Sequence, residues 1–175
     1  MTRCVPAALA VAMMVIPVAV LAQDTEWNRY TLEDLGGVFV RIEVDEVCQT
    51  AGVAASAFEA DVSLRLIEAE VGVLTRSEML AHPAMPELRV TLECAAGANG
   101  VRGAMAYSVG LRVQQVAQML RDTQITLPES VTWYSTKIGV AAAGQAPAAI
   151  ESALGQALGD FVEAWAAAHS DEGSR

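Results

Sequence analysis

Four runs of alternating apolar and polar residues constrain the fold of this 175-residue chain more than any other feature. They cover residues 38–44, 88–94, 104–116 and 131–140. Alternation with a period of two is typical of a β-strand that buries one face. Two other stretches, residues 56–69 and 147–165, repeat their apolar residues at spacings of three and four, which predicts amphipathic helices. The order of these patterns indicates an α+β domain.

The second and third runs are expected to form a hairpin. Asn99-Gly100 lies between them, and both residue types tolerate the positive φ of a tight turn. In the third run the alternation slips at Gln114-Gln115, which predicts a β-bulge or a bend. Residues 71–74 are a short apolar segment straight after the first helix, and we expect them to form one more strand, reached by a right-handed parallel crossover.

The two helices carry the clearest apolar stripes. The first is expected to begin at Ser56, with Glu59 completing a capping box. Its stripe consists of Phe58, Val62, Leu66 and Ala69, widened by Leu64 and Ile67. Residues 76–87, which contain two prolines, are interpreted as a connection. Trp133 and Trp165 are interpreted as core anchors.

These elements predict a two-layer α+β fold with the order β-α-β-β-β-β-α. A mostly antiparallel sheet of about five strands carries both helices on one face. Residues 36–168 form the single domain, residues 23–35 an N-terminal arm and residues 169–175 a polar tail.

The first 22 residues are interpreted as a signal peptide. Arg3 supplies a positive charge, residues 5–22 are uncharged and mostly apolar, and Val20-Leu21-Ala22 suits a signal peptidase. The prediction is a periplasmic or secreted protein. The alternative is an uncleaved leader that anchors the chain, because about 18 apolar residues are near the minimum that spans a bilayer.

The net charge of −10 argues against several partners. Proteins that bind nucleic acid or anionic lipid cluster their basic residues, whereas Lys137 is the only lysine here and the arginines are scattered. We therefore expect no nucleic-acid partner, and membrane contact only through an uncleaved leader. The acidic surface indicates solubility, with a cation site or a basic partner as the alternative.

Cys48 and Cys94 remain as an even pair once Cys4 leaves with the leader. Each lies at the far end of one of the first two expected strands and has the parity of that strand's apolar residues, so both thiols should point inward. They can meet only if those two strands are adjacent and parallel. The sequence does not decide between a disulfide and two buried free thiols.

No motif for catalysis, metal binding or cofactor binding is present in the sequence. His82 and His169 have no ligand or nucleophile spacing, and neither Gly-x-Ser-x-Gly nor Cys-x-x-Cys occurs. Glu43, Asp45 and Glu46 cluster at the end of the first run without the glycine of a calcium loop. No catalytic, cofactor or metal site is therefore predicted.

The chain resembles a loose group of small exported bacterial proteins of uncharacterised function. The resemblance is carried by residues 38–44, 63–66 with Ala69 and Val73, 86–90, 107–111, 132–133, and 161–162 with Trp165. Its layout is also similar to compact α+β modules of bacterial envelope assembly and transporter-accessory lipoproteins. This likeness implies a partner class only.

The functional expectation is a non-catalytic exported module for binding or envelope assembly. It would contact another envelope protein or an apolar ligand through the uncovered face of the sheet or an edge strand. The candidate contact residues are Trp27, Tyr134, Ile138 and Val140, the last three because they lie opposite Trp133 on their strand. The alternative is a small exported hydrolase that uses dispersed carboxylates or serines.

Overall fold

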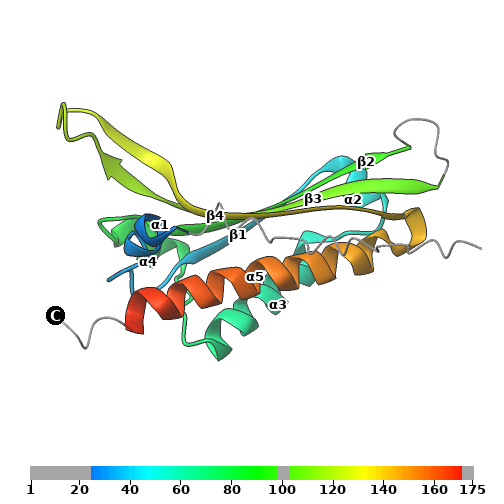
Figure 1. The fold of residues 1–175 in the computed structure, drawn as a ribbon, viewed down its shortest axis with the longest axis horizontal. Coiled ribbons are helices and arrows are strands. Elements are labelled where there is room, and N and C mark those ends of the chain that lie inside the picture. Colours follow the sequence, from blue (N-terminus) through cyan, green and yellow to red (C-terminus); the bar gives the residue numbers. More distant parts are fainter. Residues whose placement is uncertain (1–24, 98–102, 171–175) are drawn as a thin grey trace, which may run out of the picture.

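The computed structural model describes residues 25–97 and 103–170, which form an α+β domain around one mixed sheet (Figure 1). Its four strands are β1 (Phe39–Val44), β2 (Glu87–Ala96), β3 (Ala104–Gln118) and β4 (Thr126–Ala142), in that spatial order. β1 and β2 run parallel, while β2–β3 and β3–β4 are antiparallel.

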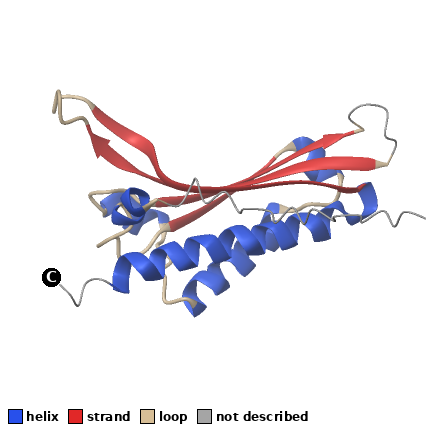
Figure 2. Ribbon diagram, viewed as in Figure 1, coloured by secondary structure: helices blue, strands red, loops and turns tan. Residues whose placement is uncertain are grey.

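Two helices cover one face of this sheet, which we call the inner face (Figure 2). They are α3 (Ala55–Glu68) and α5 (Ala146–Ser170), and a single 3-10 turn (Ala143–Gln145) joins β4 to α5. Shorter helices lie toward the two ends of the sheet: α1 (Glu26–Tyr30) and α4 (Arg76–Ala81) at one end, and α2 (Glu46–Thr50) at the other. The opposite, outer face is not covered by α3 or α5.

The core lies between the inner face and these two helices. Trp133 and Phe161 are fully buried and pack edge to face with their ring centroids 5.3 Å apart, and Trp165 packs against Phe161 at 5.8 Å. The prediction that Trp133 and Trp165 are core anchors is confirmed. The helices contribute Phe58, Val62 and Leu66 from α3 and Ile150, Leu154 and Leu158 from α5.

All four alternating runs form strands, and the second and third pair as expected. The register between β3 and β4 shifts at Val113/Gln114 and again at Gln115/Ala117, which confirms the predicted irregularity. Asn99-Gly100 lies outside the described residues. β4 begins five residues earlier than its alternation indicated, because it extends along the far end of β3.

The expected strand at residues 71–74 is wrong, so the described sheet has four strands and not about five. Val73 makes only an isolated parallel bridge with Val38. Gly37 and Gly72 approach backbone to backbone with no room for a Cβ on either residue, and Thr75 then caps the start of α4. The chain therefore turns away before a ladder can extend.

The expectation of two helices is also wrong, because the described residues form five. The proline-containing connection includes α4, which has a reciprocal capping box between Thr75 and Glu78. α2 is capped by Asp45, whose carboxylate accepts a hydrogen bond from the backbone N–H of Cys48. α3 starts after Ala54 with no side-chain cap, so the box expected at Ser56 does not form there.

The segment expected as an N-terminal arm contains α1 and then enters the core. Leu32 is fully buried and Leu35 nearly so. Asn28 donates a hydrogen bond to the backbone oxygen of Thr132, which holds α1 against β4. The predicted signal peptide and the end of the predicted tail, residues 171–175, lie outside the described residues.

Candidate functional site

A row of three arginines crosses the outer face of the sheet. The register places Arg41 of β1 opposite Arg89 of β2, Arg89 opposite Arg112 of β3, and Arg112 opposite Tyr134 of β4. Like charges on directly opposed residues destabilise a sheet, so this row needs carboxylates beside it. No sequence pattern indicated this row, because the arginines are scattered along the chain and only the strand register brings them together.

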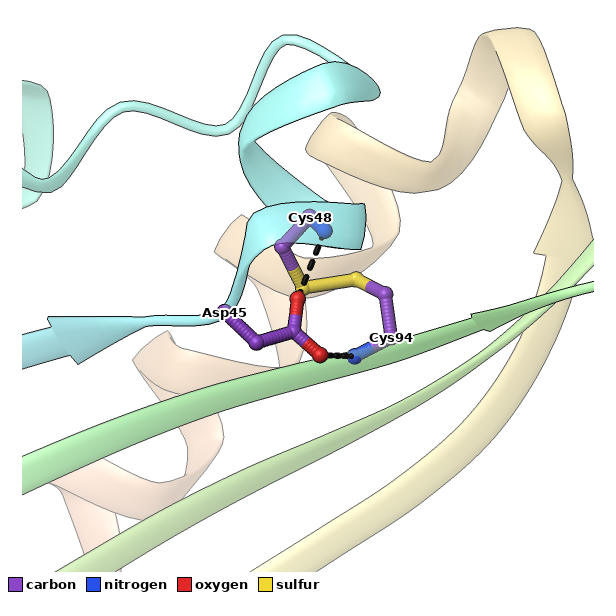
Figure 3. Close-up of side chains that lie close together, drawn as sticks. All are labelled: Asp45, Cys48 and Cys94. Carbon is purple, nitrogen blue, oxygen red and sulfur yellow. Dashed lines mark hydrogen bonds between the residues drawn. A yellow bond between two sulfur atoms is a disulfide. The ribbon is translucent and has the colours of Figure 1, made fainter.

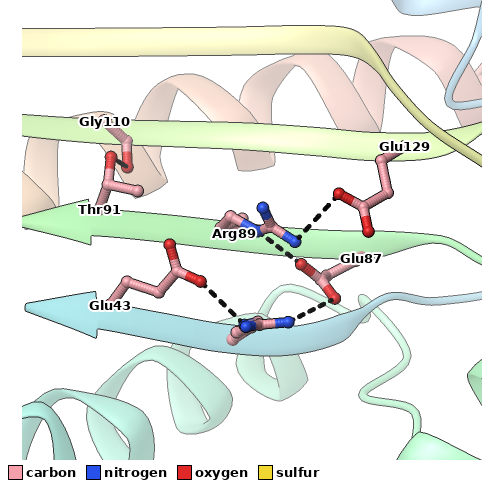
Figure 4. Close-up of polar contacts among 7 residues, drawn as sticks. Glu43, Glu87, Arg89, Thr91, Gly110 and Glu129 are labelled. Carbon is pink, nitrogen blue, oxygen red and sulfur yellow. Dashed lines mark hydrogen bonds and ion pairs between the residues drawn. The ribbon is translucent and has the colours of Figure 1, made fainter.

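Two of the three arginines are paired with glutamates (Figure 4). Arg89 Nε lies 2.7 Å from Glu87, and its guanidinium is 3.7 Å from Glu129. Arg41 pairs with Glu43 at 3.0 Å and more loosely with Glu87 at 4.0 Å. Burial lowers the pKa of Arg89, but the hydrogen bond and charge of Glu87, with smaller contributions from Glu43 and Glu129, outweigh burial and raise the pKa above its ordinary value.

Arg112, the third arginine of the row, is exposed and has no carboxylate partner among the described residues. Its neighbour Tyr134 begins an apolar strip along the outer face of β4. Ile138 is 80% exposed and Val140 is 72% exposed. The outer face therefore combines an unpaired cation with an exposed apolar strip.

The structure places the four predicted contact residues on two elements. Tyr134, Ile138 and Val140 share the outer face of β4, since they alternate with the buried Trp133 and Ser135. Trp27 is also exposed, but it lies on α1, where its ring meets Tyr30 edge to face with centroids 6.0 Å apart. The first three residues therefore form one strip, while Trp27 belongs to a separate element.

A pocket of about 470 Å³ opens at one end of the outer face, and we call it the α4 pocket. It is lined by Phe39, Arg41, Arg76, Met79, Leu80, Met85, Glu87, Gln114, Pro128 and Glu129. Gln114 is only 8% exposed, and its Oε1 has no hydrogen-bond partner in the described part of the chain. The only sequence signal for this site is the broken alternation at Gln114, which is where the bulge lies.

Cys48 and Cys94 form a disulfide that ties α2 to β2, with Cα atoms 5.1 Å apart (Figure 3). The condition set by the sequence is met, because β1 and β2 are adjacent and parallel. Cys48 itself lies in α2, one turn beyond the strand. A disulfide at this position fits an oxidising environment outside the cytosol.

Asp45 holds both ends of this disulfide. One carboxylate oxygen accepts from the Cys48 N–H at 2.6 Å and the other from the Cys94 N–H at 2.8 Å. The carboxylate and the two sulfurs lie within 4.8 Å of one another, a spacing that a metal ion can use. Here the sulfurs are bonded to each other and both carboxylate oxygens accept N–H groups, so the arrangement is a structural cross-link.

The Ser135–Asp160–Lys137 group and the two histidines make local structural contacts. Ser135 Oγ donates to Asp160 Oδ2 at 2.7 Å, and Lys137 Nζ lies 2.6 Å from the same oxygen. Ser135 is nearly buried, so this group ties β4 to α5 and offers no open nucleophile. His82 ends α4 and accepts from the N–H of Ala84, while His169 stacks on Trp165 with ring centroids 4.4 Å apart.

No protein-family model, curated protein or solved structure matches this chain. Among the helices of residues 25–97 and 103–170, none combines the length and apolar character needed to cross a bilayer.

Proposed function

We propose that this chain is an exported, non-catalytic binding module that contacts a protein partner through the outer face of its sheet. The observation that carries the proposal is the pairing of an apolar strip with an unpaired arginine on a sheet face that α3 and α5 leave uncovered. Tyr134, Ile138 and Val140 form the strip, and Arg112 is the arginine. Tyrosine and arginine are enriched at protein interfaces.

The chemistry of this face specifies the surface that would cover it. Each Å² of apolar area removed from water contributes roughly 25 cal/mol, so an apolar patch on the partner would bind the strip on β4. A partner carboxylate opposite Arg112 would supply the counter-charge that Glu87 and Glu129 give to Arg89. The partner we propose is therefore an envelope protein with an apolar patch and an adjacent acidic side chain.

Contact through the face is favoured over contact along the edge of β4. β4 is an outermost strand, and a partner strand could in principle pair with its free edge. However, α1 lies against the middle of this strand, where Asn28 donates to the oxygen of Thr132 at 2.7 Å. A continuous ladder along β4 would have to displace α1, whereas the outer face needs no rearrangement.

The compartment follows from two features that support each other. The Cys48–Cys94 disulfide suits an oxidising compartment, and the first 22 residues have the pattern of a signal peptide. We infer that the module works in the periplasm or outside the cell.

The proposal is tested by the elution volume of the exported protein in a detergent-free envelope extract, compared with that of the purified chain. The test variant combines Tyr134→Thr, Ile138→Thr and Val140→Thr, and a second variant is Arg112→Glu. The matched control changes exposed apolar residues on the outside of α3, with Leu64→Gln and Ile67→Gln combined.

We expect the wild type to elute above its monomer mass in the extract and as a monomer once purified. Both outer-face variants should elute as monomers in the extract, while the α3 control should behave like the wild type. The same elution for all four proteins would contradict the proposal. A purified wild type that is dimeric, and that the outer-face variants make monomeric, would replace the envelope partner by a second copy of this chain.

A further inference from the structure

We propose that the α4 pocket binds the C-terminal residue of a polypeptide, provided that this residue has an apolar side chain. The inference rests on the proposed function, because the pocket belongs to the same outer face. It assigns a ligand class to a site whose three chemical features are an apolar wall, a buried acceptor without a partner and an unpaired cation.

The wall can hold an apolar side chain. Met79, Met85 and Phe39 line the pocket with Leu80 and Pro128. Met79 is 7% exposed, but it lies outside the main core cluster and is buried against the pocket region instead. Unbranched methionine side chains adapt to ligands of different shape. A volume of about 470 Å³ lies within the range of small-ligand sites and exceeds that of one side chain, so part of the main chain would also enter.

Gln114 supplies the buried acceptor. Its Oε1 is buried without a hydrogen-bond partner in the described residues, and Gln114 is one of the residues that line the pocket, so a turn of its carboxamide toward the cavity is part of the inference. A buried acceptor left unpaired costs roughly 1–3 kcal/mol, so the fold keeps this group at a penalty that a ligand N–H would remove. The main-chain N–H of a bound residue is such a donor, and its nitrogen is bonded directly to the Cα that carries the side chain.

Arg76 supplies the cation. Four charged residues line the pocket, and three of them, Arg41, Glu87 and Glu129, are held in the ion pairs of the outer face. Arg76 is exposed and has no ion pair among the described residues. A carboxylate on the ligand would supply the counter-charge that Arg76 lacks. An apolar side chain, an N–H and a carboxylate on one residue together define a polypeptide C-terminus.

The test uses N-acetyl-Ala-Ala-Leu with a free carboxylate and the same peptide with a C-terminal amide. Each is titrated into the purified chain while NMR follows the methyl groups of Met79 and Met85 and the side-chain amide of Gln114. We expect saturable shifts at all three residues. The acid should bind about three- to fivefold more tightly than the amide, as for an exposed ion pair.

Three variants separate the contributions. Arg76→Ala should bring the acid down to the affinity of the amide, whereas Arg121→Ala, a control at an exposed arginine of the β3–β4 turn, should change nothing. Gln114→Met should weaken both peptides about tenfold. Equal affinities for acid and amide in the wild type, or silent methionine methyls up to millimolar peptide, would overturn the inference. The elution experiment on the extract is independent of the peptide titration. If the outer-face complex is present but the pocket residues show no shifts with peptide, only this inference is overturned and the proposed function stands.

Discussion

The two faces of the sheet differ in what their side chains do. On the inner face, Trp133, Leu111 and Val90 are fully buried against α3 and α5. On the outer face, neighbouring positions of the same strands carry Tyr134, Arg112 and Arg89, which are exposed or held in ion pairs. One set of strands therefore stabilises the domain with one face and leaves the other available for contact.

This difference shows where function can be sought in a chain without a catalytic motif. A substitution on the inner face changes stability first, so any loss of function there is ambiguous. A substitution of an exposed outer-face residue should act on the proposed binding with little effect on stability. Substitutions of buried and of exposed residues test this separation.

Leu154→Asp should unfold the domain. Leu154 lies on the buried side of α5 and is 1% exposed, and a buried carboxylate without a partner costs about 4 kcal/mol or more. The free energy of unfolding, measured in urea, should fall by at least that amount. Ile67→Asp is the control, because Ile67 is 61% exposed on α3, and it should stay within about 1 kcal/mol of the parent. A Leu154→Asp variant that unfolds like the parent would mean that α5 is not docked on the inner face.

Replacing both Cys48 and Cys94 by serine should lower the free energy of unfolding by about 4 kcal/mol, because the disulfide closes a loop with a sequence separation of 46 residues. The bond itself is checked by alkylation of the unfolded protein followed by intact mass. Cys48 and Cys94 should be labelled only after reduction. Labelling of both thiols without a reductant would show that the bond is absent.

Gln114→Met should stabilise the chain by about 1–2 kcal/mol, because it removes a buried acceptor that has no partner and keeps the length of the side chain. The same change is expected to weaken peptide binding in the α4 pocket. Urea unfolding of the variant beside the parent measures the gain. A clear loss of stability would show that the Gln114 carboxamide already serves the fold.

The smallest predicted effect is local and depends on pH. The Glu78 carboxylate accepts a hydrogen bond from the backbone N–H of Thr75, and this bond, together with a smaller contribution from the Thr75 hydroxyl as donor, lowers the pKa of Glu78 below the ordinary value of 4.5. The capping contribution of Glu78 is therefore present at neutral pH and is lost as the pH falls through this lowered pKa. The Thr75 amide resonance should follow the titration in the parent and not in Glu78→Ala. A midpoint at or above 4.5 would contradict the capping box.

The regular part of the fold was predictable because side-chain parity follows directly from the geometry of a strand. The alternation of residues 131–140 therefore predicted correctly that Trp133 is buried and that Ile138 lies on the opposite face, although β4 is an outermost strand and not central or covered in part on both sides. The short helix α4 was not predicted, because the prolines after it indicated a connection and outweighed the signal of its capping box. Pro83 and Pro86 suggested a connection, yet the capping box at Thr75 is sufficient to form α4 before them. Residues 71–74 have the composition of a strand, but the close contact between the backbones of Gly72 and Gly37 leaves only an isolated bridge between Val73 and Val38.

The candidate site was predictable only in part. Parity placed Tyr134, Ile138 and Val140 on one face of their strand. The parity argument for the disulfide holds only for Cys94 on β2, because Cys48 lies in α2 and not at the end of a strand. The arginine row depends on the relative register of three strands, which no local pattern contains. The α4 pocket depends on α4, β3 and β4 meeting around Gln114, and this is a tertiary property.

The most direct test of the account is photo-cross-linking in intact cells, with benzoylphenylalanine placed at Ile138 in one strain and at Ile67 in another. Both side chains are exposed, but only Ile138 lies on the outer face of the sheet. The account predicts a discrete cross-linked product from position 138 that Arg112→Glu abolishes, and no product from position 67. A product from position 67 alone would contradict it, as would equal products from both positions.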